Sequence, residues 1–133
     1  MLGKQIGEET GKVMVRRVIS VDGGTKVEVT VQGTGKLLGV ETRNTVTYVA
    51  GIRQDGSLYG EALGLVTGKG GEQATLKAHG VGKLHDGGAV TYRGASYYYS
   101  DSPNFRRLNG VAAVFEYEAD ADGNTKNKIW EWR

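Results

Sequence analysis

The feature that most constrains this sequence is an apolar side chain at every second position, a period that fits strands and not helices. From Lys26 to Gln32, polar and β-branched residues alternate without a fault, as they do in a strand with one buried face. The segment from Val111 to Glu118 follows the same pattern and ends with acidic residues on its solvent side. No stretch of ten or more residues places apolar side chains at helical spacing, so we expect an all-β protein.

Turn-forming residues divide the chain at intervals of roughly ten to fifteen residues, which is the spacing of an all-β sandwich or barrel. Asp-Gly and Gly-Gly pairs mark most of these points, and they adopt the positive φ angles that tight hairpins require. The one longer connection, Ser100 to Asn109, contains the only proline. The sequence between these marks predicts eight strands, at about 11–21, 25–33, 40–53, 58–67, 72–85, 89–99, 110–119 and 125–133.

Eight sequential antiparallel strands remove their exposed edges most simply by closing into an up-and-down barrel. We therefore predict an eight-stranded antiparallel up-and-down β-barrel, built as a single domain over residues 1–133, with residues 1–10 as a flexible N-terminal segment. Glycines inside the predicted strands are interpreted either as sites of sharp coiling or as places where a ligand approaches the backbone. These glycines are Gly51, Gly60, Gly64, Gly80, Gly82 and Gly94.

The charged members of each strand predict which side chains face inward. The inward set contains Val27, Val29, Val31, Val46, Tyr48, Ala50, Ile52, Ala74, Leu76, Ala78, Tyr92, Ser96, Tyr98, Ala113, Phe115, Tyr117, Trp130 and Trp132. An eight-stranded barrel is just wide enough to be filled by side chains or to hold one small ligand. A filled interior and a ligand-binding interior are therefore both kept as alternatives. The candidate ligand-binding residues of the lumen are Arg17, Tyr48, Tyr92, Ser96, Tyr98 and Tyr117.

Arg17 conflicts with the pattern of the first strand. Simple alternation of Val13, Val15, Arg17 and Ile19 places Arg17 on the apolar side, and a buried guanidinium needs a partner. Arg17 would then receive an anionic group of a ligand. The alternative is a β-bulge, or a position near the barrel end from which Arg17 reaches water.

Composition excludes several classes of function. The chain has no cysteine, 17 Lys and Arg against 15 Asp and Glu, and no apolar run long enough to span a bilayer. We therefore expect a cytoplasmic protein without a metal or cofactor, and no nucleic-acid or membrane partner. The two histidines, His79 and His85, are too far apart in sequence to form a metal pair. No catalytic residue stands out.

The segments Gly87–Tyr99, Leu108–Glu118 and Lys128–Trp132 resemble a group of small uncharacterised prokaryotic β-barrel proteins. That group is similar in architecture to the allene oxide cyclase-like (calycin-like) superfamily, to which dirigent proteins are also related. The resemblance implies an eight-stranded barrel with an apolar lumen, in oligomers. It implies no catalytic residue, because no residues of this chain match the cyclase active site.

Three functions follow as hypotheses. The first is a protein that binds a small apolar or amphipathic molecule in the lumen, and the second is a cyclase or isomerase that uses the lumen as its active site. The third is a structural protein with a filled barrel that forms homo-oligomers through the outward-facing residues Arg93, Tyr97 and Tyr99.

Overall fold

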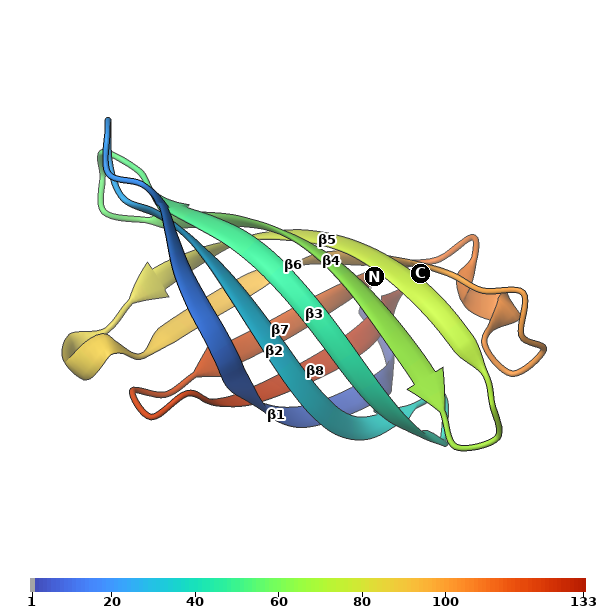
Figure 1. The fold of residues 1–133 in the computed structure, drawn as a ribbon. Coiled ribbons are helices and arrows are strands. Elements are labelled where there is room, and N and C mark those ends of the chain that lie inside the picture. The colour runs from blue at the N-terminus through green and yellow to red at the C-terminus, as the bar shows by residue number, and fades with distance from the viewer. Residues whose placement is uncertain (1) are drawn as a thin grey trace.

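The computed structural model describes residues 2–133 and forms one closed barrel. Each strand pairs antiparallel with the next, and the last pairs with the first (Figure 1). The predicted eight-stranded up-and-down barrel is therefore confirmed. The strands are β1 (Leu2–Ser20), β2 (Lys26–Leu37), β3 (Val40–Ile52), β4 (Leu58–Gly68), β5 (Gln73–Leu84), β6 (Val90–Tyr99), β7 (Ala112–Ala119) and β8 (Asn124–Trp132), with short 3₁₀ turns η1 (Asp86–Gly88) and η2 (Arg106–Leu108).

Strand β1 begins at Leu2, nine residues before the expected start, so residues 2–10 are part of the barrel wall. Glu8 lies opposite Lys36 of β2 on one side and Lys128 of β8 on the other. The local sequence, rich in Gly and Glu, gives little strand signal. Its strand conformation comes from barrel closure, because β8 would otherwise present an unpaired edge.

One end of the barrel is closed by the connection between β6 and β7, which contains η2 (orange in Figure 1). Phe105 and Leu108 of this loop are fully buried against core residues that include Leu37 and Ile129. The two ends of the loop are held together by a pair of hydrogen bonds. Asn109 Oδ1 accepts from the Ser100 amide at 2.8 Å, and Asn109 Nδ2 donates to the Ser100 carbonyl at 2.9 Å. The loop therefore acts as a plug.

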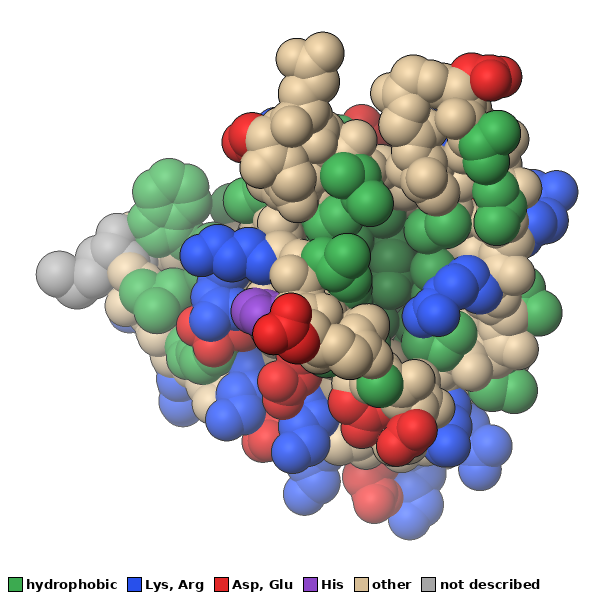
Figure 2. Space-filling view, turned by 90° about the vertical axis from the view of Figure 1, so that its left-hand side faces the viewer, with side chains coloured by type: hydrophobic (Ala, Val, Ile, Leu, Met, Phe, Trp, Pro, Cys, Tyr) green, Lys and Arg blue, Asp and Glu red, His purple; other side chains and the backbone are tan. Residues whose placement is uncertain are grey.

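The opposite end is an open mouth. Pairing between β1 and β8 stops at Lys12 and Asn124, whereas pairing between β1 and β2 continues to Ser20 and Lys26. The last part of β1 therefore projects beyond β8 as one side of the mouth (Figure 1). Figure 2 faces this end and shows hydrophobic side chains around a hollow, with charged side chains on the surrounding surface.

The inward phase is predicted correctly for most strands but wrongly for β8. Ile129 is fully buried and Glu131 is nearly so, while Trp132 is 58% exposed and Trp130 is only partly buried. Two contacts explain why Ile129 and Glu131 face inward in place of the tryptophans. Ile129 packs in the core beside the plug, and Glu131 forms an ion pair with Arg107, with Nη2 3.2 Å from Oε2. Ile52 has the expected phase but is 43% exposed, because it ends β3 at the open mouth.

Two of the strand glycines are required by close approach of neighbouring strands. Gly80 and Gly94 lie directly opposite each other on β5 and β6. A Cβ at Gly94 would overlap the His79 carbonyl oxygen, and one at Gly80 would lie 2.8 Å from the Arg93 carbonyl oxygen. The coiling interpretation fits this pair, whereas Gly51 has room for a Cβ.

Candidate functional site

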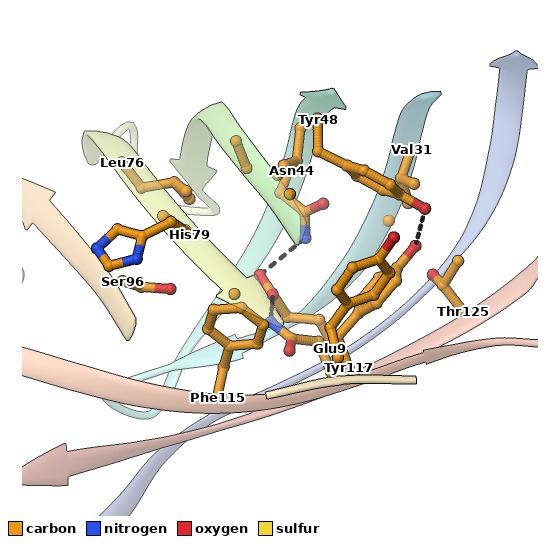
Figure 3. A pocket seen from close by; sticks show the side chains of 18 of the residues that line it. Glu9, Val31, Asn44, Tyr48, Leu76, His79, Ser96, Phe115, Tyr117 and Thr125 are labelled. Atoms are coloured by element: carbon orange, nitrogen blue, oxygen red, sulfur yellow. Dashed lines mark hydrogen bonds between the residues drawn. The ribbon is translucent and has the colours of Figure 1, made fainter. Parts of the chain in front are cut away.

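The site is a cavity of about 100 Å³ inside the lumen, between the plug and the mouth. Its walls come from all of β1 to β8, and they are mostly apolar, combining large side chains such as Leu76 and Phe115 with small ones such as Ala62 and Ala78. Figure 3 shows the polar side chains that enter this space. An apolar cavity with a few convergent polar groups is the usual form of a small-molecule site.

Three of the predicted residues, Tyr48, Tyr92 and Tyr117, form one cluster. Their ring centroids lie 5.8 to 6.1 Å apart, in edge-on and tilted arrangements. The hydroxyls of Tyr48 and Tyr117 are 3.4 Å apart, which is a long hydrogen bond. Burial raises the pKa of all three phenols. They are therefore neutral at physiological pH and offer hydroxyl protons to the cavity.

The lumen also contains the carboxyl group of Glu9, which lies in the segment predicted to be flexible and was not among the predicted site residues. Asn44 Nδ2 donates to Glu9 Oε2 at 2.8 Å, and Asn127 Nδ2 donates to Glu9 Oε1 at 3.1 Å (Figure 3). β1, β3 and β8 each provide one of the three residues. A carboxylate has room for further hydrogen bonds beyond these two, so Glu9 can also accept one from a ligand.

Burial in the apolar lumen raises the pKa of Glu9, against the opposing effect of the two amide donors. Asn127 also leaves its buried Oδ1 without a hydrogen-bond partner. Turning this amide round would place Oδ1 against the carboxylate, so its orientation follows from the need to donate to Glu9. An unsatisfied buried acceptor costs stability, and such costs are typical of functional sites.

Ser96 and Tyr98, the other two predicted residues on β6, are buried and line the same cavity towards the plug. Tyr98 packs in the core with Phe105 and Leu108. Burial raises its pKa, and the nearby Glu9 charge adds to this effect. Five of the six predicted lumen residues therefore lie around one space.

Arg17 is the exception, because β1 has a bulge. The register steps from Val13 opposite Val31 to Val15 opposite Thr30, which leaves Met14 as the extra residue. A bulge of this kind reverses the faces of the residues that follow. Arg17 consequently points outward, where its Nη2 lies 3.3 Å from Glu28. The bulge alternative was correct, and Arg17 as a lumen residue was wrong.

Glu9 was missed because residues 1–10 were expected to lie outside the barrel. One signal in the sequence pointed to a polar site, because Asn44 has the inward phase of Val46. Asn127 gave no such signal, because only the structure shows that Ile129 and its side of β8 face inward. Amides at core positions need buried partners.

His79 contributes to the cavity wall on β5, but neither histidine directs its ring into the cavity. The His79 ring faces outward and lies 5.9 Å from the Tyr97 ring, and His85 bonds to Thr91 on the exposed surface. Across residues 2–133, His, Asp and Glu form no group of three that could hold a metal ion. In the same part of the chain, no helix has the length and apolar character needed to cross a membrane.

The chain is similar in fold to several solved structures. A conserved protein of unknown function from Rhodopseudomonas palustris superposes with a TM-score of 0.83 at 14% identity, over 98% of this chain and 97% of that one. A protein of unknown function from Clostridium acetobutylicum gives 0.85 at 14% identity, over 98% of both chains. A beta-barrel like protein from Acinetobacter baumannii gives 0.83 at 12% identity, over 100% of this chain and 96% of that one. No protein-family model matches the sequence, and neither does any curated protein. The chain is thus a β-barrel of a fold found in uncharacterised bacterial proteins.

Proposed function

We propose that this protein binds a small, largely apolar molecule in its lumen, with one hydrogen-bond donor of the ligand directed at Glu9. The observation that carries the proposal is the Glu9 carboxyl group inside an apolar cavity with an open mouth. A buried carboxylate whose capacity for hydrogen bonds is only partly filled, here by Asn44 and Asn127, is costly, and a ligand donor would add a further bond.

The size of the cavity limits the ligand. Its 100 Å³ is somewhat smaller than the cavity of about 150 Å³ that holds benzene in an engineered protein. A single ring with a hydroxyl group fits if part of it extends into the mouth. The cluster of Tyr48, Tyr92 and Tyr117 provides aromatic edges against which such a ring packs.

Titration with p-cresol, followed by NMR of the protein, tests the proposal. We expect shifts confined to lumen residues, and loss of binding in Ala62→Leu, which fills the cavity from β4. Thr67→Leu is the matched control, because Thr67 is exposed on the same strand. Binding that survives Ala62→Leu, or no binding of p-cresol at all by the wild type, would contradict the proposal.

A second candidate is an isomerase that uses Glu9 as a general base. The observation in its favour is the raised pKa of Glu9, since catalytic acids and bases are tuned in this way by burial. Glu9 would remove a proton from the carbon between the carbonyl and the double bond of a β,γ-unsaturated ketone. A tyrosine hydroxyl would stabilise the enolate, and Glu9 would return the proton to the γ carbon.

Conversion of such a ketone to its conjugated isomer changes the ultraviolet absorbance, which measures the reaction directly. We expect turnover by the wild type and none by Glu9→Gln, while Glu8→Gln on the exposed neighbouring residue remains active. If Glu9→Gln binds p-cresol and the wild type shows no turnover, the protein is a binding protein and not this enzyme.

Self-association is a separate proposal. The predicted contact residues Tyr97 and Tyr99 lie on β6, and Leu63 and Leu65 occupy the corresponding rows of β4. All four are exposed, and only Lys77 carries a charge between them. A two-fold axis between the two rows would place Leu63 on Leu65 of a second copy and Tyr97 on Tyr99, without opposing like charges.

Sedimentation at increasing concentration tests this dimer. Leu63→Glu should shift the equilibrium to monomer, and Glu118→Lys, at an exposed position of β7 outside the two rows, should not. A monomeric wild type at high concentration would exclude the dimer. The similarity to the allene oxide cyclase-like superfamily and the cytoplasmic location also remain proposals, and they rest on the sequence pattern alone.

A further inference from the structure

Arg16, and not Arg17, belongs to the inner side of the barrel mouth. Beyond the bulge at Met14, Arg16 lies opposite Val29 of β2. Val29 is 2% exposed and in turn lies opposite Tyr48 of β3. Residues that face each other across antiparallel strands share one side of the sheet. Arg16 is therefore in the same inward row as Val29 and Tyr48.

The position of β1 keeps this guanidinium at the entrance and out of the packed core. β8 no longer accompanies β1 beyond Lys12, so Arg16 remains exposed although it has the inward phase. Its positive charge acts on the cavity all the same, because it lowers the pKa of Tyr48 and Tyr117 against the larger effect of burial.

Arg16 also has no acidic partner among residues 2–133. Its neighbour Arg17 holds Glu28, and the other ion pairs of the described chain join different residues. An unpaired arginine beside an apolar cavity is available to a ligand, and its planar fork matches a carboxylate.

The hydroxyl groups of Tyr48 and Tyr117 lie at the same end of the cavity as Arg16. The bond between the Tyr48 and Tyr117 hydroxyls uses only one of their two protons, and at 3.4 Å it is weak. One proton is thus left for a ligand oxygen. Arg16 and this tyrosine pair together form a set of donors at the outer end of the cavity, opposite the Glu9 end.

We propose that Arg16 and the Tyr48–Tyr117 hydroxyl pair form an anion subsite at the barrel mouth, which makes the preferred ligand a small aromatic or alicyclic carboxylic acid with a hydroxyl group at its far end for Glu9. This inference rests on the proposed function, since it names the class of molecule that the lumen binds. The ring lies among the tyrosines, and the carboxylate remains at the mouth, away from the Glu9 carboxyl group.

The test uses 4-hydroxybenzoate, which is p-cresol with a carboxylate in place of the methyl group, and its neutral isostere 4-hydroxybenzamide, with binding measured by NMR titration at low and high salt. We expect the wild type to bind 4-hydroxybenzoate about tenfold more tightly than 4-hydroxybenzamide, at the lower end for hydrogen bonds to a charged group because Arg16 is exposed. Salt should reduce this preference. Arg16→Gln should abolish it while leaving 4-hydroxybenzamide binding unchanged, and Arg16→Lys should restore part of it.

Arg17→Gln is the matched control, because it removes the same charge from the adjacent residue on the outer face. It should keep the full preference for 4-hydroxybenzoate. If 4-hydroxybenzamide binds as tightly as 4-hydroxybenzoate, or if Arg17→Gln has the same effect as Arg16→Gln, the anion subsite is wrong while lumen binding stands. If p-cresol, 4-hydroxybenzoate and 4-hydroxybenzamide all fail to bind, the proposed function fails with it.

Discussion

Replacing Phe105 by alanine should leave a cavity in the core beneath the loop that closes one end of the barrel. The Phe105 ring is fully buried, and it packs against Leu37, Tyr98 and Ile129, among other core residues. The loop backbone is held separately by the paired hydrogen bonds between Ser100 and Asn109. The variant should therefore keep its loop in place and leave an empty space in the core.

The expected loss is about 3–5 kcal/mol of unfolding free energy, which combines lost burial of the ring with the cost of the cavity. An unfolding entropy of about 2.1 cal/mol/K per residue gives roughly 0.28 kcal/mol/K for the 133-residue chain. The predicted decrease in Tm is then about 11–18 °C. This is a large share of the total stability of a typical domain.

Urea unfolding and thermal melting followed by circular dichroism measure this loss. Arg106→Ala is the control, because Arg106 is exposed on the same loop and its guanidinium donates one hydrogen bond, to the Asp101 carbonyl. It should change the unfolding free energy by about 0.5 kcal/mol or less. A loss below about 1 kcal/mol for Phe105→Ala would show that Phe105 does not close the core.

Two further predictions concern the lumen and the barrel wall. Because burial raises the folded-state pKa of Glu9 above its ordinary value of 4.5, the stabilisation from its protonated form is complete below that value and is lost as the pH rises through the folded pKa. Urea unfolding from acidic to neutral pH should show that the unfolding free energy falls less steeply with rising pH for Glu9→Gln than for the wild type, whereas Glu8→Gln should follow the wild type. Equal slopes for both variants would contradict the burial of Glu9. Gly94→Ala should destabilise the barrel by about 1–3 kcal/mol, because its Cβ would overlap the His79 carbonyl oxygen. Gly51→Ala, where a Cβ has room, should be nearly neutral. If thermal melting shows a larger decrease in Tm for Gly51→Ala than for Gly94→Ala, close approach of the strands is not what requires glycine at position 94.

Local sequence was sufficient to predict a strand and its buried face wherever polar and apolar residues alternate over several positions. The alternation of Val27, Val29 and Val31 specifies both a strand and its buried face, because every second side chain points the same way. The inward tyrosines of β3, β6 and β7 follow from the same rule, and so do most of the candidate site residues.

A β-bulge cannot be predicted in this way, because the extra residue does not change the local sequence pattern. The bulge at Met14 exchanges the faces of Arg16 and Arg17, and adjacent arginines are indistinguishable in sequence. Only the pairing with β2 shows which of them is inward. The anion subsite therefore depends on a register that two strands set together.

Residues adjacent in the chain were enough to predict most of the strand residues, the turns and most of the inward side chains, because these features depend on local sequence. Three features follow only from the folded barrel: residues 2–10 complete the wall, Glu9 meets Asn44 and Asn127, and Ile129 takes the core position expected for the tryptophans. Each of these outcomes depends on closing β8 against β1. The physical reason is that the two strands come from opposite ends of the chain, and only the closed barrel brings them into contact.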